Sequence, residues 1–428
     1  MFRRQGDTDV GQVQTDWGQF ERLVAPLSDA RRPLLLSAAA ANIANNPSKA
    51  RIRRVRGAAG CGKSLGLAAR AARLAHEGKQ VLVVAFNSTL PHYLRDIAAG
   101  HCRDLGAPLT RITFAHLHAL CEQAIDDSRI AGADMSAAVL PGMLSAYEEL
   151  IDRGIEAYRL GYGQRFDAVL VDEGQDFSLK WWNFLRRMVC RPDGELLLVA
   201  DPTQDVYGQR AWTDELRLTG AGFSGPWTEL RGSYRMPPDL TPVVAEFAQL
   251  ALDDWDVNPS VPDDHPLNVL PFQPTVRRWV NIEPGQSTGH QLGREVVALL
   301  KANPDLAPSD VVFLANSHEE GLDAVRVIEI AGYGVQHMFG RTPTEKRDRK
   351  QGFWSGATGV KGSTYQSFKG WESRAVVMSV GWSERHHRNA YVGLTRVKGD
   401  CANRRAFVTV VNSDAALRTF QERFERAS

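Results

Sequence analysis

The chain has 428 residues, enough for two or three domains with hydrophobic cores of their own. Hydrophobic residues make up 43% and charged residues 24% of it, and the formal net charge of +1 excludes a global basic excess. Any nucleic-acid binding must therefore come from local patches. The five cysteines lack metal-type spacing, and no apolar run reaches transmembrane length. With no signal peptide at the N-terminus, we expect a cytoplasmic protein that does not contact a membrane.

Short apolar runs, many of them β-branched, alternate with helical stretches along the chain. The expected strands are 52–56, 81–86, 168–171, 196–200, 275–280, 311–315, 335–339, 375–379 and 406–411. The clearest helices between them are 64–77, 291–302 and 322–331. This alternation predicts an α/β protein with parallel sheets. Because the strands form two clusters, we expect domains at 1–226 and 227–428, with a small helical insertion at about 118–163 in the first.

A glycine-rich loop follows the first expected strand and matches the pattern GxxxxGK[ST]. It consists of Gly57, Ala58, Ala59, Gly60, Cys61, Gly62, Lys63 and Ser64. Glycines let successive backbone N–H groups surround phosphate oxygens, and the helix that follows adds partial positive charge. Lys63 can reach the β- and γ-phosphates of ATP, and the Ser64 hydroxyl can bind Mg²⁺. The preceding strand is unusual for this position because it is rich in arginine.

A second motif is acidic and lies at the end of an expected apolar strand, where Asp172 and Glu173 follow residues 166–171. The carboxyl edge of an open α/β sheet is where ligands bind. Asp172 would hold Mg²⁺, and Glu173 would orient and deprotonate the attacking water. One carboxylate for the metal and one for the water is the division that nucleotide hydrolysis requires.

The run Asp172-Glu173-Gly174-Gln175-Asp176 resembles the DExQD box of superfamily 1 helicases of the UvrD/Rep/PcrA type. Stretches that resemble the later boxes of that family follow in order, at 200–207, 230–235, 364–372 and 391–396. Before it, the stretches 85–87 and 113–116 resemble two minor DNA-contact boxes. The resemblance runs from about residue 27 to residue 398. It implies two RecA-like P-loop NTPase domains that bind ATP and Mg²⁺ between them.

The resemblance also implies roles for residues that would otherwise be unremarkable. Gln204 would sense the γ-phosphate, and Arg235 and Arg396 would act as arginine fingers. Gly370 and Glu372 would face the nucleotide near its ribose. Single-stranded nucleic acid, with DNA expected, would contact Phe86, Asn87, Thr113, Phe114, His116, Tyr207 and Lys361. Phe86 and Phe114 could equally be core residues, and the basic run 341–350 could contact phosphate or be a solvated loop.

Two departures from the family pattern shape the functional prediction. Arg31 occupies the position of the glutamine that reads adenine, so other nucleoside triphosphates could be accepted. Too few residues separate Arg235 from Thr364 for the large helical insertion of larger relatives. We therefore expect a compact ATP-dependent translocase or helicase. The alternative is a nucleic-acid-stimulated ATPase switch, a subunit of a repair or antiphage complex with a partner such as a nuclease. A nucleotide kinase or GTPase is disfavoured because the chain has no guanine-binding Asn-Lys-x-Asp box.

Overall fold

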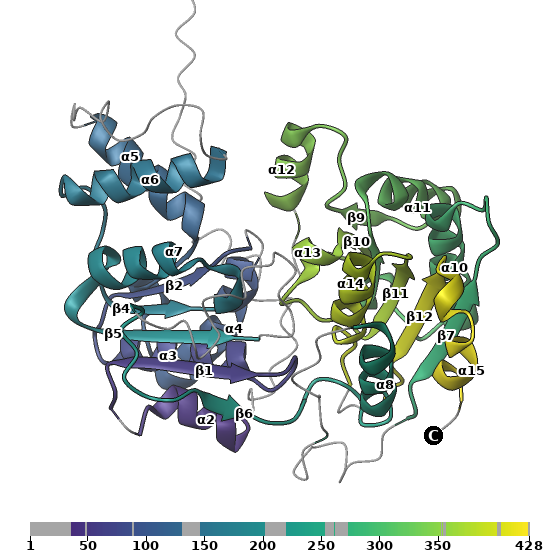
Figure 1. Ribbon diagram of the computed structural model, residues 1–428, viewed down its shortest axis with the longest axis horizontal. Helices are drawn as coiled ribbons and strands as arrows, with labels where there is room; N and C mark the ends of the chain where they lie inside the picture. The colour runs from purple at the N-terminus through teal and green to yellow at the C-terminus, as the bar shows by residue number, and fades with distance from the viewer. Residues whose placement is uncertain are drawn as a thin grey trace, which may run out of the picture. The chain divides into compact units, whose positions relative to one another are not determined.

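A computed structural model describes residues 36–47, 49–87, 90–130, 146–201, 220–252, 261, 273–351, 353, 357–399 and 404–426 (Figure 1). The described residues form two six-stranded sheets, and every strand pair within each sheet is parallel.

The first sheet has the strand order β3-β2-β4-β5-β1-β6. Its strands are β1 (Ile52–Gly57), β2 (Val81–Ala85), β3 (Ile112–His116), β4 (Phe166–Val171), β5 (Cys190–Ala200) and β6 (Thr228–Leu230). Its helices are α2 (Ala38–Asn45), α3 (Lys63–His76), α4 (Leu90–Leu105), α5 (Leu117–Ile130), α6 (Ala146–Arg159) and α7 (Leu179–Phe184). All five residues of β2 are buried, as expected of a parallel strand covered on both faces.

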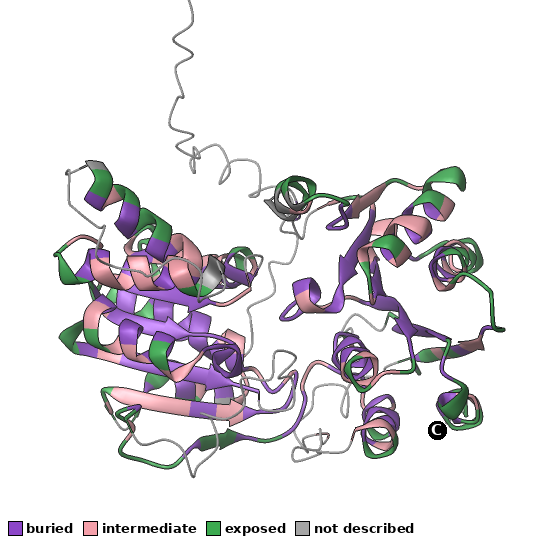
Figure 2. Cartoon of the chain, turned by 45° about the horizontal axis from the view of Figure 1, so that its top comes forward, coloured by how far each residue is buried: buried purple, intermediate pink, exposed green. Residues whose placement is uncertain are grey.

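Two apolar clusters fill the two faces of this sheet. On one face, alanines and leucines of α3 and α4, such as Leu67 and Leu94, pack with Val83 and Leu197. On the other face, residues of α5, α6 and α7 pack with Val169 and its neighbours. Figure 2 shows the buried residues running along the central strands. Both faces being covered leaves the carboxyl edge of the sheet as the natural place for a ligand.

The arginines of β1 each have a partner from a distant part of the chain. Arg53 donates to Glu195 at 2.9 Å, and Arg56 donates to Glu229 through its Nε at 3.0 Å. The guanidinium of Arg54 lies over the rings of Trp227 and Phe223, at 5.0 and 5.3 Å from their centres. These contacts explain how an arginine-rich strand can pair with β5 on one side and β6 on the other.

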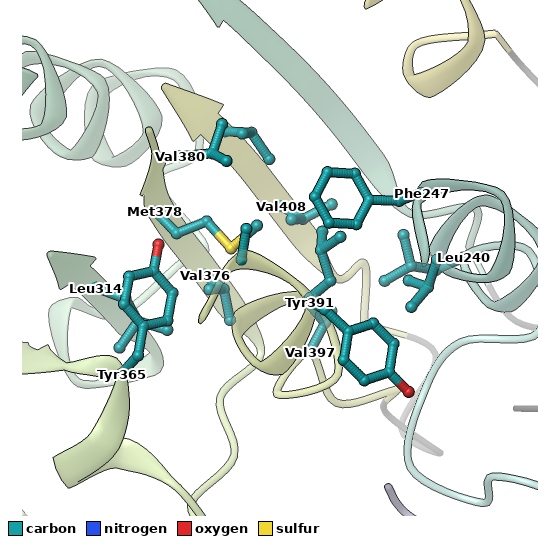
Figure 3. Close-up of a cluster of buried hydrophobic side chains, with 14 of the residues drawn as sticks. Leu240, Phe247, Leu314, Tyr365, Val376, Met378, Val380, Tyr391, Val397 and Val408 are labelled. Carbon is teal, nitrogen blue, oxygen red and sulfur yellow. The ribbon is translucent and has the colours of Figure 1, made fainter. Parts of the chain in front are cut away.

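The second sheet has the strand order β7-β12-β11-β8-β10-β9. Its strands are β7 (Val276–Asn281), β8 (Val311–Ala315), β9 (Val335–His337), β10 (Val360–Thr364), β11 (Ala375–Val380) and β12 (Phe407–Asn412). Its helices are α8 (Thr241–Ala251), α10 (Thr288–Ala302), α11 (His318–Ile330), α12 (Pro343–Gln351), α13 (Tyr365–Phe368), α14 (Glu384–Leu394) and α15 (Phe420–Phe424). Figure 3 shows Phe247 of α8 and Tyr391 of α14 in the buried cluster that also holds Val376 and Met378 of β11.

The predicted α/β class with two parallel sheets is confirmed. All nine expected strands are present, with ends shifted by up to six residues, but the strands β3, β6 and β10 were not expected. Helices α5 and α6 occupy the stretch expected to be helical, between β3 and β4. In the part of the chain that the structure describes, no helix is both long and apolar enough to cross a membrane.

Candidate functional site

The carboxyl ends of the first sheet bring the predicted site residues into one row. Following the strand order, the row contains His116 at the end of β3, Asn87 just after β2, Asp172 after β4, Asp201 after β5 and the glycine-rich loop that begins at the end of β1. Residues from separate stretches of sequence therefore meet at one edge (Figure 1). This is the edge at which open α/β sheets bind ligands.

The loop of residues 57–64 joins β1 to α3 and requires two of its glycines. Gly60 and Gly62 have φ angles of 81° and 92°, in the left-handed region that favours glycine. Gly62 caps the N-terminus of α3, so the partial positive charge of that helix end lies at the loop. The structure thus gives the loop the strand–turn–helix setting that the pattern needs to bind phosphate.

Lys63 is buried at the start of α3, and its ammonium group lies among oxygen atoms. It donates hydrogen bonds to the carbonyls of Gly57 at 2.7 Å and Ala58 at 2.9 Å, and it lies 3.5 Å from Asp201 Oδ2. Burial acts to lower the pKa of Lys63, but nearby acidic groups, Asp201 and Glu173 among them, leave that pKa raised. The side chain is therefore a buried, fully charged cation beside the loop.

Ser64 and Asp172 form the direct link between the loop and the acidic strand end. The Ser64 hydroxyl donates to Asp172 Oδ2 at 2.7 Å. Burial, together with the charge of Glu173, raises the pKa of the Asp172 carboxyl. A hydroxyl and a carboxylate side by side are the hard oxygen ligands that Mg²⁺ prefers alongside phosphate oxygens. The residues present therefore fit a magnesium ion.

Glu173 is held in an uncommon conformation next to Asp172. Its φ angle is 53°, and it is 7% exposed. Its Oε2 accepts a hydrogen bond from Gln175 Nε2 at 2.6 Å. Burial alone would raise the pKa of Glu173, but the positive charges of Lys369, Lys63 and Arg396 lower it. The carboxylate is therefore kept ionised, as an acceptor for a proton must be.

Lys369 brings a positive charge from the second sheet to this acidic end. Its ammonium group donates to both carboxylate oxygens of Asp176 at 2.8 Å and lies 3.9 Å from Glu173 Oε2. Lys369 and Asp176 are each 1% exposed. The sequence did not single out Lys369, Asp176 or Gln175 as site residues. Their only distinction in the sequence is that they lie within the motifs at 172–176 and 364–372.

The segment 233–235 lies against the glycine-rich loop. The backbone N–H of Tyr234 donates to the carbonyl of Gly60 at 2.9 Å. A Cβ added at Gly60 would lie 2.4 Å from Ser233 Oγ and 2.7 Å from the Cβ of Arg235. Gly60 is therefore required by close approach as well as by its backbone angle.

Arg235, the last residue of this segment, forms an ion pair with Glu372. Arg235 Nε donates to Glu372 Oε2 at 3.0 Å, and Lys398 also donates to Glu372. Although burial acts to raise it, these two cations lower the pKa of Glu372 to about 2. Gly370, two residues earlier, has a φ of 88° and packs against Leu90 of α4.

Arg396 is buried just after α14. Its Nε donates to the Val392 carbonyl at 3.1 Å and its Nη2 to the Thr395 hydroxyl at 3.0 Å. Burial and the neighbouring Arg235 lower the pKa of Arg396 to about 10, against the opposing effect of Glu173. Its guanidinium remains charged at neutral pH and acts electrostatically on Glu173.

The predicted nucleic-acid residues have varied surroundings. Phe86 stacks on Trp181 with ring centres 5.6 Å apart, and Phe114 packs against the buried cluster below α3 and α4. Thr113 is half-buried in β3. His116, at the end of β3, accepts a hydrogen bond from the Ala119 N–H at 3.1 Å. Of these residues, Phe86 and His116 lie at the carboxyl edge.

Asn87 and Lys361 are both engaged with backbone carbonyls. The Asn87 amide donates to the carbonyls of Gln366, Ser367 and Lys369, at 3.1, 3.3 and 3.4 Å. Lys361 is buried near the start of β10 and donates to the Ser309 carbonyl at 2.6 Å. Lys361 therefore lies at the amino edge of its sheet, away from the other candidates. Arg31, Gln204 and Tyr207 are outside the described residues.

Comparison with known families finds a similarity over part of the chain. A model of the UvrD/REP helicase N-terminal domain matches residues 141–214, a stretch that contains Asp172 and Glu173. Over this stretch the chain is similar to UvrD-like helicases. These are ATP-dependent enzymes that act on nucleic acid, which agrees with the resemblance of the motifs. No curated protein matches the chain.

Proposed function

We propose that the chain is an ATP hydrolase that moves along single-stranded nucleic acid, with DNA as the expected strand. The observation that carries the proposal is the junction of the glycine-rich loop with the acidic strand end. There Ser64 bonds Asp172 at 2.7 Å, and Glu173 stands next in sequence with cations from the second sheet around it. This arrangement suits transfer of a phosphoryl group to water.

Each residue of the junction has a distinct part in the proposed reaction. The backbone N–H groups of the loop and Lys63 would bind the phosphates of ATP, after the lysine exchanges its two loop carbonyls for phosphate oxygens. Ser64 and Asp172 would hold Mg²⁺, which when bound neutralises charge on the phosphates. Glu173 would orient the attacking water and accept its proton.

Positive charge from the later part of the chain would complete the site. Arg396 and Arg235 would stabilise negative charge that develops on the transferred phosphoryl group. Arg235 would first leave or share its bond with Glu372. Gly370 and Glu372 would lie near the ribose, Gln204 would sense the γ-phosphate, and Arg31 would face the base.

The proposed path for the strand follows the carboxyl edges. His116 and Phe86 lie at that edge of the first sheet, and Gln366 follows β10 at that edge of the second. The Asn87 amide joins the two edges through the carbonyls of Gln366, in α13, and Lys369, just after it. We leave Lys361 out of the path because its ammonium group is at the opposite edge.

A second candidate function is an ATPase switch that does not separate strands by itself. It is favoured by the short connection between β9 and β10, in which the described residues form one helix, α12. Such a compact chain would serve as the motor or switch subunit of a larger repair or defence complex, with a nuclease as one possible partner.

The decisive experiment measures ATP hydrolysis with and without single-stranded DNA, single-stranded RNA and duplex DNA. Lys63→Ala serves as the inactive control. Strand-stimulated hydrolysis would support both candidate functions, and unwinding of a tailed duplex by the chain alone would select the helicase. A rate that no nucleic acid changes would overturn the proposed strand dependence.

A further inference from the structure

Among the tryptophans in the described part of the chain, Trp382 has by far the most exposed side chain. Its side chain is 78% exposed, whereas the other described tryptophans are at most 8% exposed. Those buried residues are Trp181, Trp182, Trp227, Trp279 and Trp371. A large aromatic side chain in water forgoes the burial that stabilises the other five, and it presents a flat ring to any ligand at this surface.

The backbone on both sides of Trp382 is firmly anchored. Gly381 is buried, and a Cβ there would lie 2.4 Å from the ring of His386. Ser383 caps α14 by accepting a hydrogen bond from the His386 N–H at 3.3 Å. On the other side, Ser413 donates its backbone N–H and its hydroxyl to the Val380 carbonyl, both at 3.0 Å. The exposed ring is thus presented by a fixed turn, which limits the ordering cost of binding.

A network of side-chain amides places this turn at the carboxyl edge of the second sheet. Asn316, directly after β8, donates to the Ser379 hydroxyl at 3.2 Å and accepts from Asn389 of α14 at 3.2 Å. Gln366, after β10, donates to Asn389 Oδ1 at 3.4 Å. The ends of β8, β10 and β11 therefore meet here, and Trp382 follows Ser379 by three residues.

The charge next to Trp382 suits a phosphate backbone. Residues 384–388 contain two arginines and one glutamate. Glu384 is paired with Arg388, whose Nη2 lies 2.7 Å from it, and Arg385 is exposed. An exposed aromatic ring beside net positive charge is the combination with which proteins bind single strands, the ring taking a base and the cation a phosphate.

We propose that Trp382 is a base-stacking platform for single-stranded nucleic acid at the carboxyl edge of the second sheet, with Arg385 as its phosphate contact. The inference rests on the proposed function and adds to it a contact in the second sheet. Because every base has an aromatic face, the platform binds strands of any sequence.

The test measures the affinity of the full chain for a fluorescently labelled oligothymidylate, by anisotropy. Trp382→Ala is expected to weaken binding about tenfold, within the range that stacking of one base provides. Trp382→Phe should keep the affinity to within about twofold, since a phenyl ring also stacks. Ile330→Ala is the matched control, because Ile330 is 87% exposed at the end of α11, away from the carboxyl edge.

Two further measurements distinguish a stacked base from a contact of another kind. A stacked base quenches indole fluorescence, so the strand should quench the wild-type chain more strongly than Trp382→Phe. Arg385→Gln should reduce the slope of log affinity against log salt by about one.

If Trp382→Ala binds the oligothymidylate as tightly as the wild-type chain does, the inference is overturned. That result would mean that the ring either has no binding role or contacts a protein. Equal loss in Trp382→Phe and Trp382→Ala would exclude stacking. Failure of the wild-type chain to bind the strand would instead overturn the proposed function, so the two failures are distinguishable.

Discussion

Glu173 combines strain, burial and charge in one residue. A left-handed backbone is unfavourable for a glutamate, and such residues persist where surrounding contacts fix them. Here Gln175 bonds its carboxylate, and the carbonyl of Glu173 accepts the N–H of Asp176 at 2.9 Å. These contacts hold the Glu173 carboxylate between Gln175 and Lys369 and leave it little freedom to turn away.

We expect Glu173→Gln to lower the rate of ATP hydrolysis by roughly 10²–10⁴-fold, the usual contribution of a general base. Nucleotide affinity should be retained, because glutamine keeps the size and hydrogen-bonding capacity of the side chain. Steady-state hydrolysis and equilibrium binding of a labelled nucleotide check the two parts. Turnover at the wild-type rate would contradict the assignment of Glu173 as the base.

Some site residues can be predicted from the sequence, and the contacts of others cannot. Lys63, Asp172 and Glu173 stand in short patterns whose spacing implies the local geometry, so they could be predicted. The partners of the β1 arginines could not, because Glu195 and Glu229 lie more than 140 residues away in sequence. Nor does a local pattern reveal that Asn87 binds carbonyls of α13, since that contact depends on how the chain folds back.

Strands can be predicted from the sequence where all of their residues are both buried and apolar. The run 311–315 was expected with the ends that β8 has, because all of its residues are buried and apolar. Strand β10 was missed because its sequence, Val-Lys-Gly-Ser-Thr, is polar, although every residue in it is buried. Strand β6 has three residues and two of them are exposed, so it carries no hydrophobic pattern.

At the loop between β1 and α3, Gly60→Ala should destabilise the fold and abolish hydrolysis. An alanine there has an unfavourable backbone angle, at a cost of about 1–2 kcal/mol, and also collides with Ser233 and Arg235. Gly78→Ala is the matched control, since Gly78 has a φ of 83° but no atom within 4 Å of an added Cβ. Thermal unfolding and ATPase assays of both variants isolate the effect of close packing. Equal unfolding temperatures in the two variants would contradict it.

Strand β9 should make stability depend on pH through His337. Burial and the nearby Arg349 lower the pKa of His337 from its ordinary 6.5 to about 4. Between these values the unfolded histidine binds a proton and the folded one does not, so the free energy of unfolding should fall as pH drops from about 6.5 to about 4. Urea unfolding across this range should show a shallower decline for His337→Gln. An unchanged decline would assign it to other groups.

At the scale of the whole molecule, the ion pair of Lys369 and Asp176 joins the two sheets. Removing one partner of a buried pair leaves an uncompensated charge, so Lys369→Met should destabilise the chain by about 3–5 kcal/mol. The double variant Lys369→Met with Asp176→Leu should recover much of that loss, because it removes both charges. Urea unfolding of the single and double variants measures the difference. A single variant as stable as wild type would mean that the pair contributes nothing.

The hydrogen bond between Tyr234 and Gly60 joins main-chain atoms only. A change in the shape of the glycine-rich loop is therefore transmitted to the connection between β6 and α8 through the backbone. The side chain at position 234 takes no part in this coupling. Substitution of Tyr234 by any residue other than proline leaves that hydrogen bond in place. Adding or deleting one residue between Leu230 and Met236 instead moves the donor away from its acceptor. The constraint on this connection is consequently its length rather than its composition.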